Sequence, residues 1–170
     1  CFPKDVKALA AASKESKIES KMLDASLEVN DSQPLIVVEM ARERLGILKG
    51  KKITVLGLAF KPDTDDIRES RSEVVIKKLL EEDAIVTGHD PEAMKNFKEI
   101  SDIKMCNNAL DALNEADCLI LMTEWQEYIN LDYELIKQKM SGNVIIDGRR
   151  AFDYRRMEEV GFDYKAIGLG

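Results

Sequence analysis

The chain has 170 residues, of which 45% are hydrophobic and 34% charged, and its formal net charge is −7 at pH 7. These values fit a folded globular protein rather than a disordered segment. The negative charge argues against a nucleic-acid backbone or an anionic membrane as the main partner, although a few local Arg and Lys residues suffice for a small phosphorylated ligand.

Three widely spaced cysteines, Cys1, Cys106 and Cys118, form neither a disulfide framework nor a zinc-binding pattern. We therefore expect no metal site and a reducing, cytoplasmic location. The sequence contains no signal peptide and no apolar run of membrane-spanning length. Because the chain begins with Cys rather than Met, we expect a fragment of a longer protein.

Residues 1–48 are predicted to be helical, since residues 8–27 contain good helix formers without Pro or Gly. A polar stretch at 30–33 predicts an interruption, after which Pro34 suits the first turn of a new helix. Apolar residues then recur at helical spacing. This segment cannot cover its apolar face alone, so we expect it to pack on another domain or on a second subunit.

From residue 49 onward, short apolar runs alternate with helical segments. Strands are expected at 53–60, 84–89, 103–106, 118–122, 144–146 and 164–169. Helices are expected at 72–82, 92–98, 109–116, 131–140 and 154–160. This alternation predicts an α/β fold with a parallel sheet and helices on both faces. Ligands of such sheets bind at the carboxyl ends of the strands, which makes residues 61–71, 90, 123–125 and 147–150 the candidates.

The first motif is Cys1-Phe2-Pro3-Lys4-Asp5. A thiol followed closely by a cation and a carboxylate is a plausible setting for a nucleophile, because a nearby positive charge favours the thiolate. On spacing alone, a chain end that carries a cysteine by chance is the favoured interpretation.

The second motif runs from Gly57 to Ser70 with the sequence GLAFKPDTDDIRES. A glycine at a strand end permits close backbone approach, and the following Lys and Arg supply donors for a phosphate or a sugar. The motif lacks the G-x-G-x-x-G pattern of a dinucleotide loop. Its acidic residues favour a solvated loop that caps the next helix over a cation site.

The third motif is Asp147-Gly148-Arg149-Arg150. Paired arginines at a strand end suit bidentate contacts to phosphate or carboxylate, although a turn with solvent-facing charge explains them as well. We expect structural roles for the single histidine, His89, and for Cys106 and Cys118. Trp125 could line a pocket or cap the core.

Together, Cys-Phe-Pro-Lys-Asp, GLAFKPDTDDIRES, Leu-Met-Thr-Glu-Trp and Ile-Ile-Asp-Gly-Arg-Arg resemble, in order and spacing, signatures of the UDP-glucose/GDP-mannose dehydrogenase family. The resemblance covers essentially the whole chain and is strongest to the UDP-glucose branch. It implies a central helical segment at 1–48, through which family members dimerise. It also implies a C-terminal, Rossmann-like UDP-sugar-binding domain at 49–170.

The resemblance implies an NAD-dependent oxidation of UDP-glucose to UDP-glucuronate by two hydride transfers, through a cysteine thiohemiacetal and thioester. Cys1 would be the nucleophile, and Asp5 would position or activate water. Lys4 and Arg68 would contact the cofactor. Contacts to the substrate would come from Phe2, Phe60, Lys61 and Arg149.

The family's N-terminal Rossmann domain and the catalytic Lys and Asn of its central region have no counterpart in this sequence, so we expect this piece alone to be inactive. Arg71 stands where the family often has a small residue. Two alternatives stay open: a dehydrogenase of a UDP-N-acetylhexosamine or of GDP-mannose, and a non-catalytic nucleotide-sugar-binding or dimerisation module. A flavodoxin-like or receiver-type domain fits the coarse pattern but explains neither the Cys1 motif nor the paired arginines.

Overall fold

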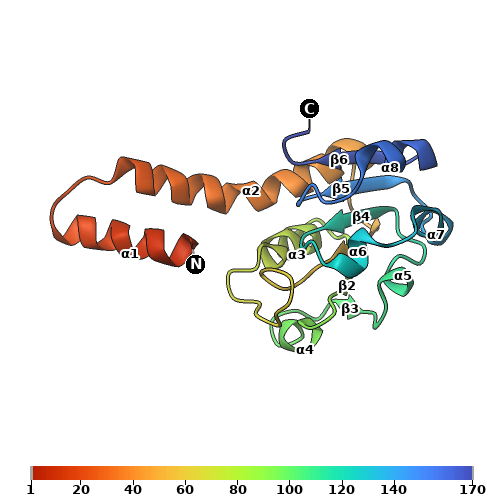
Figure 1. Ribbon diagram of the computed structural model, residues 1–170, viewed down its shortest axis with the longest axis horizontal. Helices are drawn as coiled ribbons and strands as arrows, with labels where there is room; N and C mark the ends of the chain where they lie inside the picture. The colour runs from red at the N-terminus through yellow and green to blue at the C-terminus, as the bar shows by residue number, and fades with distance from the viewer. Residues whose placement is uncertain (1, 170) are drawn as a thin grey trace. The chain divides into compact units, whose positions relative to one another are not determined.

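The computed structural model describes residues 2–169 and divides the chain into two compact units, one up to Pro34 and one from Leu35 onward. The first unit contains α1 (Phe2–Glu15) and the first part of α2 (Lys21–Leu45). Both helices are labelled in Figure 1. Within the described residues, no helix combines the length and hydrophobicity needed to cross a membrane.

The break between α1 and α2 lies at Lys17, which has a left-handed φ of 56°. The amide of Ile18 donates to the carbonyl of Ser13 and that of Lys17 to the carbonyl of Lys14, at 2.8 and 3.0 Å. This pair of bonds satisfies the last carbonyls of a helix in the manner of a Schellman motif. The chain therefore reverses here without a glycine, which is why the uninterrupted run of helix formers did not predict the break.

The predicted interruption at residues 30–33 is wrong, because α2 continues through this stretch with Pro34 in its interior. Asp31 and Ser32 are exposed, so their side chains are compatible with a helix. Beyond the proline, Val37, Val38 and Ala41 are almost fully buried in the second unit. We attribute the continuity of the helix to this burial, which offsets the hydrogen bond that Pro34 cannot make.

The second unit is built on a six-stranded parallel sheet with strand order β3-β2-β1-β4-β5-β6. This is the order of a Rossmann-like doubly wound fold, which confirms the predicted fold class. The strands are β1 (Lys52–Leu56), β2 (Ile85–His89), β3 (Lys104–Met105), β4 (Cys118–Leu121), β5 (Val144–Asp147) and β6 (Asp163–Ala166).

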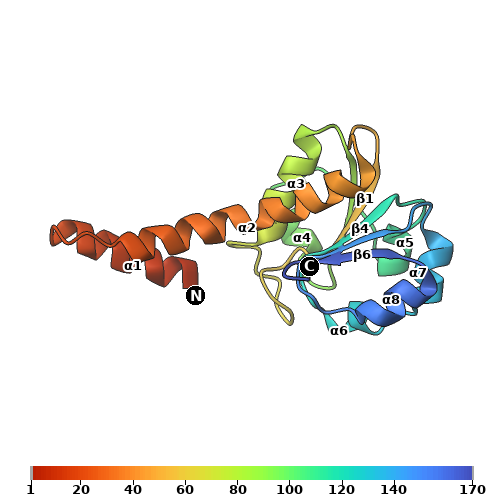
Figure 2. The same ribbon diagram turned by 90° about the horizontal axis from the view of Figure 1, so that it is seen from above.

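Helices cover both faces of the sheet, as Figure 2 shows. On one face, α3 (Arg71–Glu81) lies beside the C-terminal part of α2, where Leu35 and Val74 line a shared groove. On the other face lie α5 (Ala109–Ala112), α7 (Tyr133–Lys139) and α8 (Tyr154–Val160), which contact one another in series. Two further short helices are α4 (Met94–Phe97) and α6 (Gln126–Ile129).

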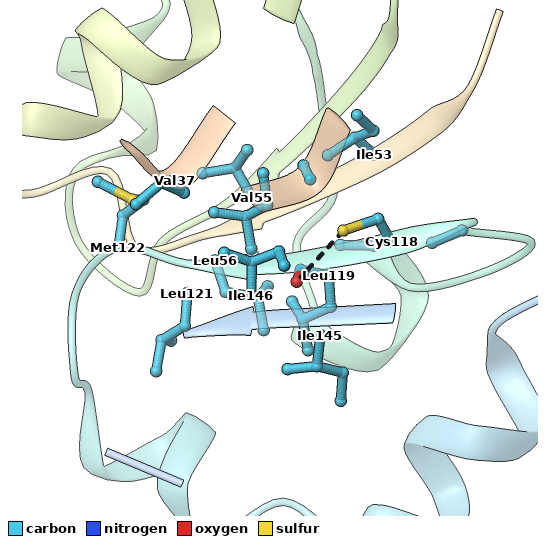
Figure 3. Close-up of a cluster of buried hydrophobic side chains, with 14 of the residues drawn as sticks. Val37, Ile53, Val55, Leu56, Cys118, Leu119, Leu121, Met122, Ile145 and Ile146 are labelled. Atoms are coloured by element: carbon cyan, nitrogen blue, oxygen red, sulfur yellow. Dashed lines mark hydrogen bonds between the residues drawn. The ribbon is translucent and has the colours of Figure 1, made fainter. Parts of the chain in front are cut away.

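A buried apolar layer of the core lies where β1, β4 and β5 run side by side, and Figure 3 shows part of it. All four residues of β4 and of β5 are buried. Strands covered on both faces read as continuous apolar runs, which is why the sequence marked these three clearly. Cys118 lies in this layer, and burial raises the pKa of its thiol well above the usual range, so the cysteine is structural, as expected.

Helix lengths follow local capping. Asp153 caps α8 at its start and Gly161, with φ of 94°, ends it, so the predicted helix at 154–160 is confirmed. The helix predicted at 109–116 ends at Ala112, because the chain turns there and Glu115 adopts a left-handed φ of 59°. The short helix α6 was not predicted, since one helical turn leaves no periodic pattern in the sequence.

Candidate functional site

The strand order reverses between β1 and β4, and the loops that follow these two strands meet at the carboxyl edge of the sheet. In doubly wound sheets this reversal opens a crevice in which ligands bind. Gly57 follows β1 with a left-handed φ of 91°, and a Cβ atom built on it would lie 2.4 Å from the backbone nitrogen of Thr123. The two loops are therefore packed together as closely as backbone atoms allow.

The loop after β1 is held by a hydrogen bond at each backbone group from Gly57 to Ala59. Ser72, Ser70 and Thr123 donate their hydroxyls to the carbonyls of Gly57, Leu58 and Ala59 at 2.6, 2.7 and 2.7 Å. The amide of Gly57 donates to the carbonyl of His89 at 2.9 Å. The amides of Leu58 and Ala59 donate to Asp90. This loop is consequently a rigid base for the side chains that follow it.

Asp90, directly after β2, is fully buried and anchors the edge. Its two carboxylate oxygens accept five donors: the backbone amides of Leu58, Ala59, Glu92 and Ala93, and the indole nitrogen of Trp125. The carboxylate thereby ties together the segments that follow β1, β2 and β4. Trp125 is thus part of the buried framework, which answers the question its position left open.

His89, which precedes Asp90, is also buried, and its Nδ1 lies 2.9 Å from the hydroxyl of Tyr128. Burial lowers the pKa of the imidazole, so the neutral form is favoured in the folded protein. The imidazole packs edge-on against the ring of Tyr128 in α6, with 5.6 Å between the ring centroids. This environment agrees with the structural role expected for the only histidine.

Phe60 and Lys61 stand at the end of this rigid loop, on the solvent side of the edge. Phe60 is 36% exposed, although its backbone amide donates to the carbonyl of Asp66 at 2.8 Å. Lys61 is exposed as well. An exposed aromatic ring beside an exposed cation on a fixed backbone suits the recognition of a ligand that has both an apolar face and a negative charge.

Arg149, after β5, forms a two-point ion pair with Glu124, which follows β4. Its Nε and Nη2 donate to the carboxylate at 2.5 and 2.9 Å, and 41% of its side chain is exposed. The backbone beneath it is fixed by Asp147, which accepts bonds from the amides of Arg149, Ala151 and Phe152 and from the hydroxyl of Tyr164. Arg149 is therefore a half-buried cation with a defined orientation.

Arg68 lies on the same loop as Lys61 and is paired with Asp66 through Nε and Nη2, at 2.9 and 2.7 Å. These hydrogen bonds lower the pKa of Asp66 to about 2. The Arg68 side chain is 87% exposed, so the pair stands in solvent. The fold thus places Phe60, Lys61, Arg68 and Arg149 on loops of one sheet edge.

The remaining predicted site residues belong to the first unit. Lys4 and Asp5 are exposed in the first turns of α1. Phe2 begins that helix, and its side chain lies outside the described residues, as does Cys1. Within residues 2–169, no group of three or more His, Cys, Asp or Glu side chains is arranged to hold a metal ion.

Two functional features escaped the sequence analysis. The pairing of Glu124 with Arg149, and three of the five donors of Asp90, join segments that are 25 to 35 residues apart. Position did carry a signal, because each of these acids follows a buried strand at the predicted ligand edge. What the sequence could not supply is which acid binds internal donors and which faces a cation.

Residues 54–154 match the model of the UDP-binding domain of the UDP-glucose/GDP-mannose dehydrogenase family. The chain belongs to this family. The carboxyl edge that carries Phe60, Lys61 and Arg149 thus belongs to a family UDP-binding domain, and the predicted family membership is confirmed.

Family relatives align with nearly the whole chain. A UDP-glucose 6-dehydrogenase of Haloferax volcanii is 43% identical over 98% of the chain, and a putative one of Bacillus subtilis is 35% identical over 99%. The chain spans only 37 and 39% of the length of these two relatives.

Solved structures of the family superpose over the same range. A UDP-glucose dehydrogenase from Pyrobaculum islandicum has a TM-score of 0.85 at 34% identity and covers all of the chain, which corresponds to 37% of its own length. An NDP-N-acetyl-D-galactosaminuronic acid dehydrogenase from Methanosarcina mazei has a TM-score of 0.86 at 28% identity, over 99% of this chain and 37% of its own.

Proposed function

We propose that this chain forms the nucleotide-sugar-binding side of an NAD-dependent UDP-glucose 6-dehydrogenase, which oxidises UDP-glucose to UDP-glucuronate. The observation that carries the proposal is the rigid carboxyl edge of β1, β4 and β5, which presents Phe60, Lys61 and Arg149 within a family UDP-binding domain. The 43% identity to a UDP-glucose 6-dehydrogenase favours this branch of the family.

In this proposal, residues 49–170 bind the UDP-sugar. Lys61 and Arg149 supply charge-assisted hydrogen bonds to the anionic diphosphate or the sugar, and the Phe60 ring covers an apolar face of the ligand. Residues 1–48 carry Phe2 as a further substrate contact and form a dimer interface. The apolar groove on α2, lined by Met22, Ala25 and Val29, motivates the dimer, which sedimentation velocity would test.

The proposed chemistry is the one that the family resemblance of the Cys1 motif implies. The C6 alcohol of the sugar loses a hydride and a proton to become an aldehyde, to which the Cys1 thiolate adds as a thiohemiacetal. Loss of a second hydride, together with the hydroxyl proton, from that adduct leaves a thioester. Water, positioned by Asp5, hydrolyses the thioester, which releases the carboxylate and the free thiol. NAD, when bound, accepts the two hydrides.

The described residues fit a few contacts to NAD rather than a complete dinucleotide-binding site. Gly57 provides no open phosphate loop, because the space for its Cβ is filled by Thr123. Asp90, at the strand end where dinucleotide folds place a ribose-binding acid, is saturated by internal donors. Arg68, exposed beyond the crevice, and Lys4 are the residues that we assign to the cofactor.

Isothermal titration calorimetry of this chain with UDP-glucose, UDP-N-acetylglucosamine, GDP-mannose and NAD tests the proposal. We expect UDP-glucose to bind more tightly than GDP-mannose, and NAD to give no comparable heat. Tighter binding of UDP-N-acetylglucosamine would instead support the hexosamine alternative, which the Methanosarcina mazei structure favours. Binding of none of the three sugar nucleotides would contradict a preformed nucleotide-sugar site on this chain.

A further inference from the structure

Glu124 engages Arg149 from one side only. Its two carboxylate oxygens accept the Nε and Nη2 protons at 2.5 and 2.9 Å, across 25 residues of sequence. An arginine has five N–H donors in a planar fork, so this side-on contact leaves three of them, including both protons of Nη1. The remaining end-on edge of the guanidinium matches the spacing of two oxygens of a phosphate or carboxylate.

Both partners stand on backbone that the sheet edge fixes. On the Glu124 side, the neighbouring Thr123 hydroxyl donates to Ala59 at 2.7 Å and the Trp125 indole donates to Asp90 at 3.1 Å. On the Arg149 side, its own amide donates to the buried Asp147 at 2.9 Å. A two-point contact between two fixed supports holds one orientation of the guanidinium, whereas an ordinary surface ion pair fluctuates among several.

Both members of the pair are ionised at neutral pH. The hydrogen bond from Arg149 lowers the pKa of Glu124, and the same bond raises the pKa of Arg149. Because the pair has no net charge, its value to an anionic ligand is directional: it offers oriented donors rather than an attractive field.

We propose that Glu124 is a positioning residue, which holds the Arg149 guanidinium side-on so that its end-on edge is preorganised for the anionic part of the nucleotide sugar. The inference rests on the proposed function, because it takes Arg149 as a ligand contact. It adds Glu124 to the binding site and predicts the direction of its effect. Although Glu124 is negatively charged, its removal weakens the binding of a negatively charged ligand.

The direction of the change in UDP-glucose affinity distinguishes a positioning role of Glu124 from simple neutralisation of the Arg149 charge. If Glu124 only cancelled the charge of Arg149, then Glu124→Ala would tighten the binding of UDP-glucose, since a repelling carboxylate would be gone. If it positions Arg149, then Glu124→Ala weakens binding by about fivefold to tenfold, because an ordered side chain becomes free to rotate. Glu124→Gln retains one acceptor and should fall between Glu124→Ala and the wild type.

The test is calorimetry with UDP-glucose on the wild-type chain, Glu124→Ala, Glu124→Gln, Arg149→Ala and the double variant, with thermal unfolding to verify folding. Glu127→Ala, which removes a nearby exposed carboxylate, is the control and should bind as the wild type does. We expect the double variant to bind no more weakly than Arg149→Ala, since Glu124 acts through the arginine.

Unchanged or tighter binding by Glu124→Ala, with Arg149→Ala weakened, would overturn the positioning role and leave the proposed function intact. Additive losses in the double variant would do the same. Absence of UDP-glucose binding by the wild type, or full binding by Arg149→Ala, would overturn the role of Arg149 itself and the inference with it.

Discussion

Replacing Asp90 by Asn is expected to destabilise the second unit by about 3 kcal/mol or more, although the two side chains have nearly the same shape. The carboxylate accepts five donors inside the protein. An amide exchanges one acceptor oxygen for an NH₂ group, which then faces backbone N–H groups instead of accepting their hydrogen bonds. Urea unfolding followed by circular dichroism measures the loss.

Asp111→Asn is the matched control for this change. Asp111 is exposed in the first turn of α5, so its replacement should alter the free energy of unfolding by less than about 0.5 kcal/mol. If Asp90→Asn were as stable as Asp111→Asn, the carboxylate would not be the anchor of the ligand edge. We also expect Asp90→Asn to weaken UDP-glucose binding, because the loop that carries Phe60 and Lys61 is hydrogen-bonded to this side chain.

The second large effect is expected for Gly57→Ala, with a loss of about 2–4 kcal/mol in the free energy of unfolding. Two causes add. A left-handed φ of 91° disfavours any side chain, and the new Cβ would lie 2.4 Å from the nitrogen and 2.8 Å from the Cα of Thr123. Because these are backbone atoms, relief requires the loops after β1 and β4 to move apart.

Gly50→Ala separates the two causes. Gly50 has a similar left-handed φ of 75°, but nothing lies within 4 Å of an added Cβ. Its replacement should therefore cost only the backbone term, about 1 kcal/mol. Equal losses in the two variants, measured by urea unfolding, would show that Gly57 and Thr123 are not in tight contact and that the loops after β1 and β4 can move apart easily.

Much of the fold was predictable because β1, β4 and β5 are buried on both faces. Such strands leave runs like Ile53 to Leu56 that no exposed segment matches, and their alternation with helices determines a parallel sheet. Helices with capping residues were equally predictable, as α8 shows with Asp153 at its start and Gly161 at its end. Prediction failed where tertiary packing overrode a local rule, as at Pro34, or where Lys17 adopted a conformation typical of glycine.

The sequence predicted the location of the candidate site but not the hydrogen-bond partners of its residues. Strand ends located Lys61, Asp90, Glu124 and Arg149 at one edge, since carboxyl ends of parallel strands coincide there. Chemistry alone did not tell Asp90, which is saturated by internal donors, from Glu124, which holds a half-exposed arginine. That distinction depends on burial and on partners distant in the sequence, which the sequence pattern does not encode.

The most direct test of a nucleotide-sugar site at this edge is the affinity of Lys61→Ala for UDP-glucose, measured by calorimetry. Lys49→Ala is the matched control, because Lys49 precedes β1 at the opposite edge of the sheet and is 73% exposed. We predict that Lys61→Ala weakens binding about tenfold or more, as expected for a lost bond to a charged group, and that Lys49→Ala binds as the wild type does. Equal affinities of the two variants would contradict the account.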